Sequence, residues 1–316
     1  MIAPLTGSAA TFGRSAQNGI ETALAQLGAS ARLEVSYEDD QFMPSKTIAA
    51  FNKLVELDGV DIVVTIGSTP SNAVAPLAQR RAILHLAAAS ATSVARARPY
   101  VMRTWSSGLA EGARIAKEAL RRQLSKVALV FTSNDYHEAV KAGFIQHFPA
   151  DKLVLIQEHS SEQPDYKTFL LKARSVSADG IALLLHPGGA GLLARQAAEL
   201  HYSPTFFSAI QLEDSREHKI AKGALKGAWY VTGGCSESFK RRYLQRYGDT
   251  DVISLAALHY DLLLVLNDFK GRPSAKRLRD YLLKIQDRKG AIGHFSVVKA
   301  HDDQYLTLPL VVRTVP

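Results

Sequence analysis

The stretch from Ile62 to Asn72 constrains the fold more than any other part of the chain. It reads Ile-Val-Val-Thr-Ile and then Gly-Ser-Thr-Pro-Ser-Asn. The apolar and β-branched run predicts a strand buried on both faces of a parallel sheet. A helical pattern begins at Ser71 and continues to Arg80. The segment therefore predicts a strand, a loop rich in hydroxyl groups and a helix, in that order.

A second segment repeats this arrangement. The apolar run from Ile83 to Leu86 predicts a strand, and Ser90-Ala91-Thr92-Ser93 follows it. A helix N-terminus carries partial positive charge and unpaired amide donors, which suit a carboxylate. We therefore expect both loops to converge on one small acidic molecule. The alternative is that Ser68, Thr69 and Ser71 merely cap the helix, a role that serine and threonine commonly fill.

Strand and helix patterns alternate along most of the chain, which predicts an α/β fold with parallel sheets and right-handed crossovers. The pattern restarts after Ser106 and indicates a second lobe. Three helices without intervening strands follow, so we expect the chain to return to the first lobe. The expected strands are 32–37, 62–66, 83–86, 127–131, 153–157, 180–185, 205–208, 228–231, 292–295 and 306–312. The expected helices are 13–27, 44–57, 71–80, 108–123, 138–147, 166–175, 191–200, 236–247, 254–269 and 274–286.

Composition narrows the function classes. The chain has 316 residues, 47% of them hydrophobic, and a formal charge of +8. Lysine and arginine are scattered rather than clustered in stripes, and no nucleic-acid-binding motif is present, so we expect no nucleic-acid partner. No apolar run is long enough to span a membrane. A single cysteine, Cys235, excludes an intrachain disulfide.

The residues do not predict an enzyme or a metal site. No G-x-S-x-G nucleophile motif and no H-E-x-x-H metal motif occurs. The glycine-rich segment 187–191 lacks the Lys-Ser/Thr pair of a phosphate-binding loop. We therefore expect no catalytic residue, no metal and no cofactor.

Several motifs taken in order resemble the type I periplasmic binding proteins, specifically the Leu/Ile/Val-binding branch that serves ABC importers. They are Pro4-Leu5-Thr6-Gly7 with Phe12-Gly13, Tyr37-Glu38-Asp39-Asp40 with Pro44, Val60 to Val64 with Gly67-Ser68-Thr69, Ser90 to Ser93, and Met102-Arg103-Thr104. The resemblance covers nearly the whole chain. It rests on the order and spacing of these motifs, since each is weak alone.

The resemblance implies two Rossmann-like lobes with parallel-core sheets, joined by three crossover segments, and a ligand in the cleft between the lobes. Lobe I would comprise 1–106 and 235–295, and lobe II 107–234 and 296–316. The family's first strand would begin before Met1. The sequence leaves open whether the chain is a processed form or begins at an internal start.

The resemblance also implies which residues bind the ligand. Ser68 or Thr69 after the third strand, and Ser90, Ala91 and Thr92 after the fourth, would hold a ligand carboxylate. Phe12 would lie against the ligand. Tyr136 would close over it from lobe II, and His186 with Pro187 occupies the position of a second lobe II tyrosine. Phe12 and Tyr136 could alternatively be ordinary surface aromatics.

One position departs from the family pattern. The family's acidic residue for the ligand ammonium should follow strand 205–208, where this chain has Gln211, with Glu213 and Asp214 slightly later. A buried ammonium without a charged or strong acceptor partner is unfavourable by several kcal/mol, roughly. Gln211 therefore favours an aromatic or aliphatic carboxylic acid over an α-amino acid, unless Glu213 reaches the ligand.

We therefore expect an extracytoplasmic solute-binding protein that acts as a monomer. It would capture a small carboxylate-bearing solute, an amino acid or an aromatic or aliphatic acid, and deliver it to the membrane permease of an ABC importer. The alternative is a ligand-sensing domain of the same fold that signals to a protein partner. We expect the protein to be periplasmic or extracytoplasmic.

Overall fold

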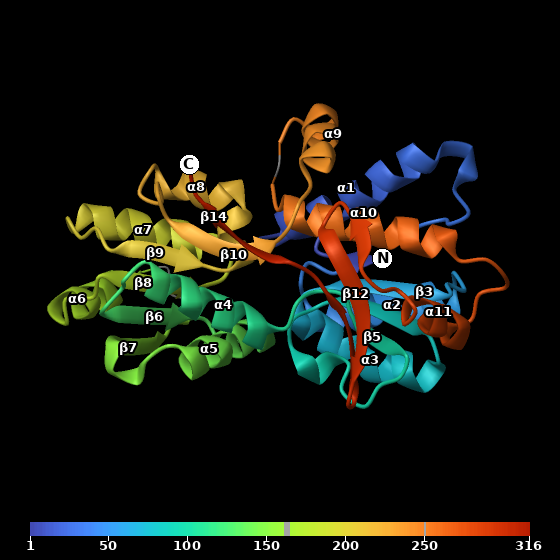
Figure 1. Cartoon of the computed structure of the whole chain (residues 1–316), viewed down its shortest axis with the longest axis horizontal. Helices are drawn as coiled ribbons and strands as arrows, with labels where there is room; N and C mark the ends of the chain where they lie inside the picture. Colours follow the sequence, from blue (N-terminus) through green and yellow to red (C-terminus); the bar gives the residue numbers. More distant parts are fainter. Residues whose placement is uncertain (161–164, 250) are drawn as a thin grey trace. The chain divides into compact units, whose positions relative to one another are not determined.

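The computed structural model describes residues 1–160, 165–249 and 251–316, and the chain divides into two compact units. Unit 1 comprises Met1–Ser106 and Gly233–Pro309, and unit 2 comprises Ser107–Thr232 and Leu310–Pro316. The chain thus passes from one unit to the other three times, as expected for this fold class. Figure 1 labels the helices and strands.

Unit 1 is built on a mixed sheet with a parallel core. The sheet has the strand order β11-β12-β13-β5-β4-β3-β1-β2. Its strands are β1 (Ile2–Ala3), β2 (Glu38–Asp39), β3 (Ile62–Ile66), β4 (Leu84–Ala88), β5 (Val101–Arg103), β11 (Arg288–Gly290), β12 (Gly293–Ala300) and β13 (Asp303–Thr307). Its helices are α1 (Ala10–Leu27), α2 (Pro44–Glu56), α3 (Ser68–Arg81), α9 (Glu237–Tyr247), α10 (Ile253–Asp268) and α11 (Ala275–Leu282), with short 3₁₀ turns η1 (Gly28–Ser30) and η2 (Thr92–Val94).

Unit 2 contains a second sheet, with the strand order β14-β10-β9-β8-β6-β7. Its strands are β6 (Val127–Phe131), β7 (Leu153–Glu158), β8 (Gly180–Leu184), β9 (Thr205–Ser208), β10 (Trp229–Gly233) and β14 (Leu310–Thr314). Its helices are α4 (Gly108–Arg121), α5 (Asp135–His147), α6 (Lys167–Ser175), α7 (Gly189–Glu199) and α8 (Ser215–Ala221), with 3₁₀ turns η3 (Ala150–Lys152) and η4 (Ile210–Glu213). In Figure 1, α4 and α5 run along one face of this sheet.

The helices pack closely where small residues allow it. In unit 1, α1 lies beside α10, a mostly apolar helix with nearly all of its residues buried. A Cβ atom at Gly19 would lie 2.1 Å from the carbonyl oxygen of Ala256, so only glycine permits this helix contact. In unit 2, Phe207 stacks on Trp229 with ring centroids 4.7 Å apart, and both are fully buried. Each unit therefore has its own core.

Two expected strands are wrong, and one helix was not expected. Residues 32–37 form no strand; the strand in this part of the chain is β2, Glu38–Asp39, which pairs with Ile2 and Ala3 of β1. The expected strand 306–312 is instead two strands, which separate at Pro309, and proline has no amide donor to continue a ladder. Helix α8 has no counterpart in the sequence prediction.

The lobe boundary near the C-terminus also differs. Residues 296–309, expected in the second lobe, lie in unit 1. Strand β12 pairs with β13 as an antiparallel hairpin, and β13 pairs parallel with β5. The guanidinium of Arg103 on β5 binds the carboxylate of Asp303 on β13, which anchors this hairpin in the unit 1 sheet.

The described residues include no helix of the length and apolar character needed to span a membrane.

Candidate binding site

The loop after β3 forms part of the candidate site in unit 1. Gly67 ends the strand with a φ of +89°, and α3 begins at Ser68, three residues earlier than the periodicity predicted. A Cβ atom at Gly67 would lie 2.3 Å from the ring of Phe42, so the turn requires glycine. Ser68 and Thr69 therefore occupy the first turn of α3, where backbone donors are unpaired within the helix.

The loops after β3 and β4 meet through one side chain. The hydroxyl oxygen of Ser68 accepts hydrogen bonds from the amides of Ser90 at 3.1 Å and Ala91 at 3.2 Å. The Ser68 side chain is buried. The two amides thus share one hydroxyl oxygen, and this contact holds the two loops together.

Two hydroxyls of these loops are more accessible. Thr69 is half-buried, and within the described ranges its side chain has no hydrogen-bond partner. Thr92 is half-buried as well, and its hydroxyl lies 3.5 Å from Nη2 of Arg96, a long contact. Both hydroxyls lie where neighbouring parallel strands end, and both can donate to a carboxylate.

A buried polar chain supports this edge of the sheet. Thr65 Oγ1 lies 2.7 Å from Ser71 Oγ and 2.7 Å from His85 Nε2. Ser71 also donates to the carbonyl of Gly67, so it caps within the turn. Burial, and secondarily the charge of Arg98, lowers the pKa of His85 to about 3, so its imidazole is neutral. These side chains serve the fold of the loop.

Phe12 lies in the first turns of α1 and is half-buried. The preceding loop is held by Asp39, whose carboxylate accepts from the amide of Leu5 at 2.9 Å and from the amide and hydroxyl of Thr6. Gly13, beside Phe12, packs against Pro4. A Cβ atom at Gly13 would lie 2.0 Å from the carbonyl oxygen of Pro4. The start of α1 is therefore fixed by the loop after β1.

In unit 2, three adjacent strands bring three polar residues together at their carboxyl ends. His137 follows β6, His186 follows β8 and Gln211 follows β9. The rings of His137 and His186 have centroids 6.0 Å apart. The Nε2 atoms of Gln211 and His137 lie 2.9 Å apart. Gln211 and His186 were predicted site residues, whereas His137 was not.

His137 makes polar contacts through both ring nitrogens. Its Nδ1 lies 2.7 Å from the carbonyl oxygen of Thr132 and 2.8 Å from Nδ2 of Asn134, and a proton on Nδ1 satisfies the first of these contacts. Burial lowers its pKa to about 4, so the ring is neutral and Nε2 accepts from the amide of Gln211. The carbonyl oxygen Oε1 of Gln211 is buried, and among the described residues it has no hydrogen-bond partner. An unpaired acceptor remains at this position.

The acidic residues near Gln211 are engaged within unit 2. The carboxylate of Glu213 accepts from Arg313 and, at 2.9 Å, from the hydroxyl of Thr232. Asp214 caps α8 and pairs with Arg216 at 2.6 Å. Both carboxylates that follow β9 are therefore bound to side chains of unit 2.

Tyr136 is engaged too. Its hydroxyl donates to Glu111 at 2.8 Å, and burial, followed by the charge of Glu111, raises its pKa well above the usual value. Asn134 caps α5 by accepting from the amides of Tyr136 and His137. Glu111 and His137 were missed in the sequence, where an isolated histidine or a glutamate on a helix carries no distinctive spacing.

Pro187 lies in the turn between β8 and α7 and is half-buried, as is His186. Burial lowers the pKa of His186. Across the described part of the chain, no three or more His, Cys, Asp or Glu side chains gather in a way that could hold a metal ion.

Comparison with known proteins places these sites in context. A family model described as periplasmic binding protein matches residues 1–267. A Leu/Ile/Val-binding protein, BraC3 of Rhizobium johnstonii, is 27% identical over 73% of this chain. The chain spans just under two thirds, 66%, of that relative.

Solved structures share the fold. A leucine-binding protein LivK from Thermotoga maritima superposes with a TM-score of 0.87 at 22% identity, over 99% of this chain and 94% of that chain. A solute-binding protein of an ABC transporter from R. palustris, solved with benzoate, gives a TM-score of 0.85 at 21% identity, over 100% and 92% of the two chains. The family model covers most of the sequence, and the members of this family are solute-binding proteins rather than enzymes. The chain belongs to the periplasmic binding protein family.

Proposed function

We propose that this protein binds a small carboxylic acid that lacks a free ammonium group and delivers it to the membrane permease of an ABC importer. The observation that carries the proposal is the environment of Gln211. Its Oε1 atom is buried without a hydrogen-bond partner in the part of the chain that the structure describes, and the neighbouring carboxylates of Glu213 and Asp214 are bound to arginines. Unit 2 thus offers the solute a neutral acceptor at this position.

We assign the solute carboxylate to unit 1. Thr69 and Thr92 carry accessible hydroxyls, and Thr69 lies in the first turn of α3, where the helix dipole favours negative charge. Ser68, Ser90 and Ala91 hold the two loops in place. We assign Phe12 of unit 1 and Tyr136, His186 and Pro187 of unit 2 to the solute as further contacts.

The neutral acceptor discriminates between solutes. An α-ammonium group placed near Gln211 would lose its water shell without gaining a negative partner, which is unfavourable by several kcal/mol, roughly. A phenolic or aliphatic hydroxyl group of the solute can instead donate to Oε1 of Gln211. A solute with a purely apolar end has no charged group there that must be removed from water. The two structural relatives represent solutes with and without an ammonium group, since one is named for leucine and the other was solved with benzoate.

A thermal-shift screen tests the proposal. A bound solute raises the melting temperature by mass action. We expect benzoate, 4-hydroxybenzoate or short fatty acids to raise it and α-amino acids to leave it unchanged. Stabilisation by leucine or isoleucine alone would contradict the assignment of Gln211, and no shift with any carboxylic acid would contradict the proposed function.

We further propose that the protein works outside the cytoplasmic membrane as a monomer. The family description supports the location, and an importer with a membrane permease is the partner that this role requires. Light scattering of the solute-bound protein should give the mass of one chain. A stable dimer would contradict the monomer.

A further inference from the structure

The turn between β8 and α7 lacks a capping side chain of its own. The N-cap residue of α7 is Gly188, which has a φ of +96°. The first amides of a helix have no partner within the helix, and a serine, threonine or aspartate at the N-cap usually supplies one. A glycine cannot do so. The start of α7 therefore depends on a group from elsewhere in the chain.

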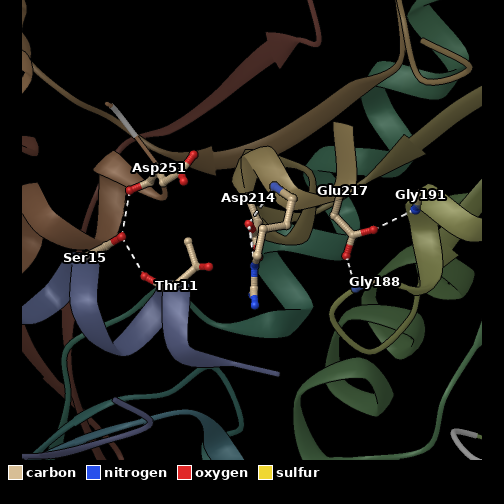
Figure 2. A network of polar contacts seen from close by, with 8 residues as sticks. Thr11, Ser15, Gly188, Gly191, Asp214, Glu217 and Asp251 are labelled. Atoms are coloured by element: carbon tan, nitrogen blue, oxygen red, sulfur yellow. Dashed lines mark hydrogen bonds and ion pairs between the residues drawn. The ribbon is translucent and has the colours of Figure 1, made fainter. Parts of the chain in front are cut away.

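Glu217 on α8 provides that group. One carboxylate oxygen accepts from the amide of Gly188, and the other accepts from the amide of Gly191 at 2.6 Å. Figure 2 shows both bonds converging on the one carboxylate. Glu217 is 1% exposed, so water cannot replace it readily. A negative charge at this end of α7 is also favoured by the helix dipole.

Helices α7 and α8 pack in direct contact at the glycines of α7. A Cβ atom at Gly191 would lie 2.3 Å from the main-chain oxygen of Glu217. A Cβ atom at Gly189 would lie 2.7 Å from the hydroxyl of Tyr166. The glycines thus allow α8 and Tyr166 to approach α7, and the carboxylate fits into the space that remains.

We propose that Glu217 is a positioning residue for solute binding, because by capping α7 from α8 it holds the turn that carries His186 and Pro187. This inference rests on the proposed function, which assigns His186 and Pro187 to the solute. Glu217 itself touches the turn and need not touch the solute. Protonation of the carboxyl group weakens the cap, since the protonated oxygen is a poorer acceptor for the amide that faces it.

The surroundings of Glu217 place this change near neutral pH. Burial raises its pKa to about 7, against the opposing effect of the two glycine amides. Asp214 raises the pKa further and Arg216 lowers it, and Tyr166 faces the same carboxylate. Burial lowers the pKa of both histidines of the unit 2 site, that of His137 to about 4. Solute affinity should therefore fall as the pH drops through about 7.

The test compares Glu217→Gln with wild type, using benzoate as the probe. Glutamine is a neutral analogue of the protonated carboxyl group. We expect the dissociation constant at pH 8 to rise about tenfold, as for the loss of one hydrogen bond to a charged group. Wild-type affinity should weaken between pH 8 and pH 6, and the variant should lack that dependence. Identical pH profiles in the two proteins would overturn the proposal.

Two controls separate the possible failures. Glu118→Gln removes another buried carboxylate of unit 2, bound by Arg121 and Arg122 on α4, and should leave the pH profile of binding intact. Hydrogen exchange of the amides in 186–191 should become faster in Glu217→Gln without any solute. If benzoate does not bind the wild type, the proposed function is at fault, and this exchange still decides the role of Glu217. Unchanged exchange would overturn that role.

Discussion

Gln211 donates a hydrogen bond from its side-chain Nε2 to Nε2 of the neutral His137, across 2.9 Å. With the amide in this orientation, Oε1 of Gln211 is buried and has no hydrogen-bond partner among the described residues. The contact therefore sets the polarity of the unit 2 half of the proposed site.

Gln211→Glu should reverse solute preference. A carboxylate at this position supplies the negative partner that an α-ammonium group needs, and it repels a second carboxylate. We expect leucine binding to appear and benzoate binding to weaken at least about tenfold, measured by calorimetry. Gln196→Glu, which adds the same charge elsewhere in unit 2 where Gln196 accepts from the amide of Tyr166, is the matched control. Loss of benzoate binding in both variants would indicate a general charge effect.

Thr92→Val should weaken carboxylate binding by one to two orders of magnitude, because a hydrogen bond to a charged group contributes about 1.5–3 kcal/mol. Valine keeps the shape of the side chain and removes the hydroxyl. Thr168→Val on the exposed surface of α6 is the control for the substitution itself. An unchanged calorimetric affinity for benzoate would remove Thr92 from the site.

Ser68→Ala should destabilise the protein. It removes the acceptor shared by the buried amides of Ser90 and Ala91, and an unsatisfied buried donor costs about 1–3 kcal/mol. Urea denaturation of the unliganded variant measures this change. Ser93→Ala, which loses only exposed contacts with Asn72, should stay within about 0.5 kcal/mol of wild type. Equal stability of the two variants would contradict the linking role of Ser68.

Glu217 should make stability depend on pH. Its pKa is raised in the folded protein to about 7 from 4.5, so folding favours the protonated form. The contribution of Glu217 to the free energy of unfolding is therefore full below pH 4.5 and is lost as the pH rises through about 7. The difference amounts to about 3 kcal/mol. Denaturation measures the free energy of unfolding at pH 5 and at pH 8. This free energy should decrease less from pH 5 to pH 8 in Glu217→Gln than in wild type. Parallel losses would contradict the raised pKa.

Sequence patterns predicted the buried strands well. The boundaries of β3, β6 and β9 match the expected ranges, because β-branched and aromatic residues, which favour strands, dominate these segments. The strand expected at 32–37 lies at 38–39 instead, as the two-residue strand β2 that pairs with the two-residue strand β1. Helix α8 was not predicted, because it is short and charged and has no clear periodicity.

The candidate site was only partly predictable. The position of the loops follows from the order of strands, so Ser68, Ser90 and Gln211 could be singled out. Their partners could not, because the contacts of Ser68 with Ser90 and of Gln211 with His137 join residues 22 and 74 positions apart. No local pattern in the sequence records which side chain meets which amide.

A matched pair of solutes tests the central claim most directly. Leucine and 4-methylpentanoate share a carboxylate and a branched chain, and they differ in the α-ammonium group. Calorimetric titration of the wild-type protein at pH 8 should show 4-methylpentanoate binding at least about tenfold more tightly than leucine. Tighter binding of leucine would show that the protein satisfies an ammonium group and would contradict the account.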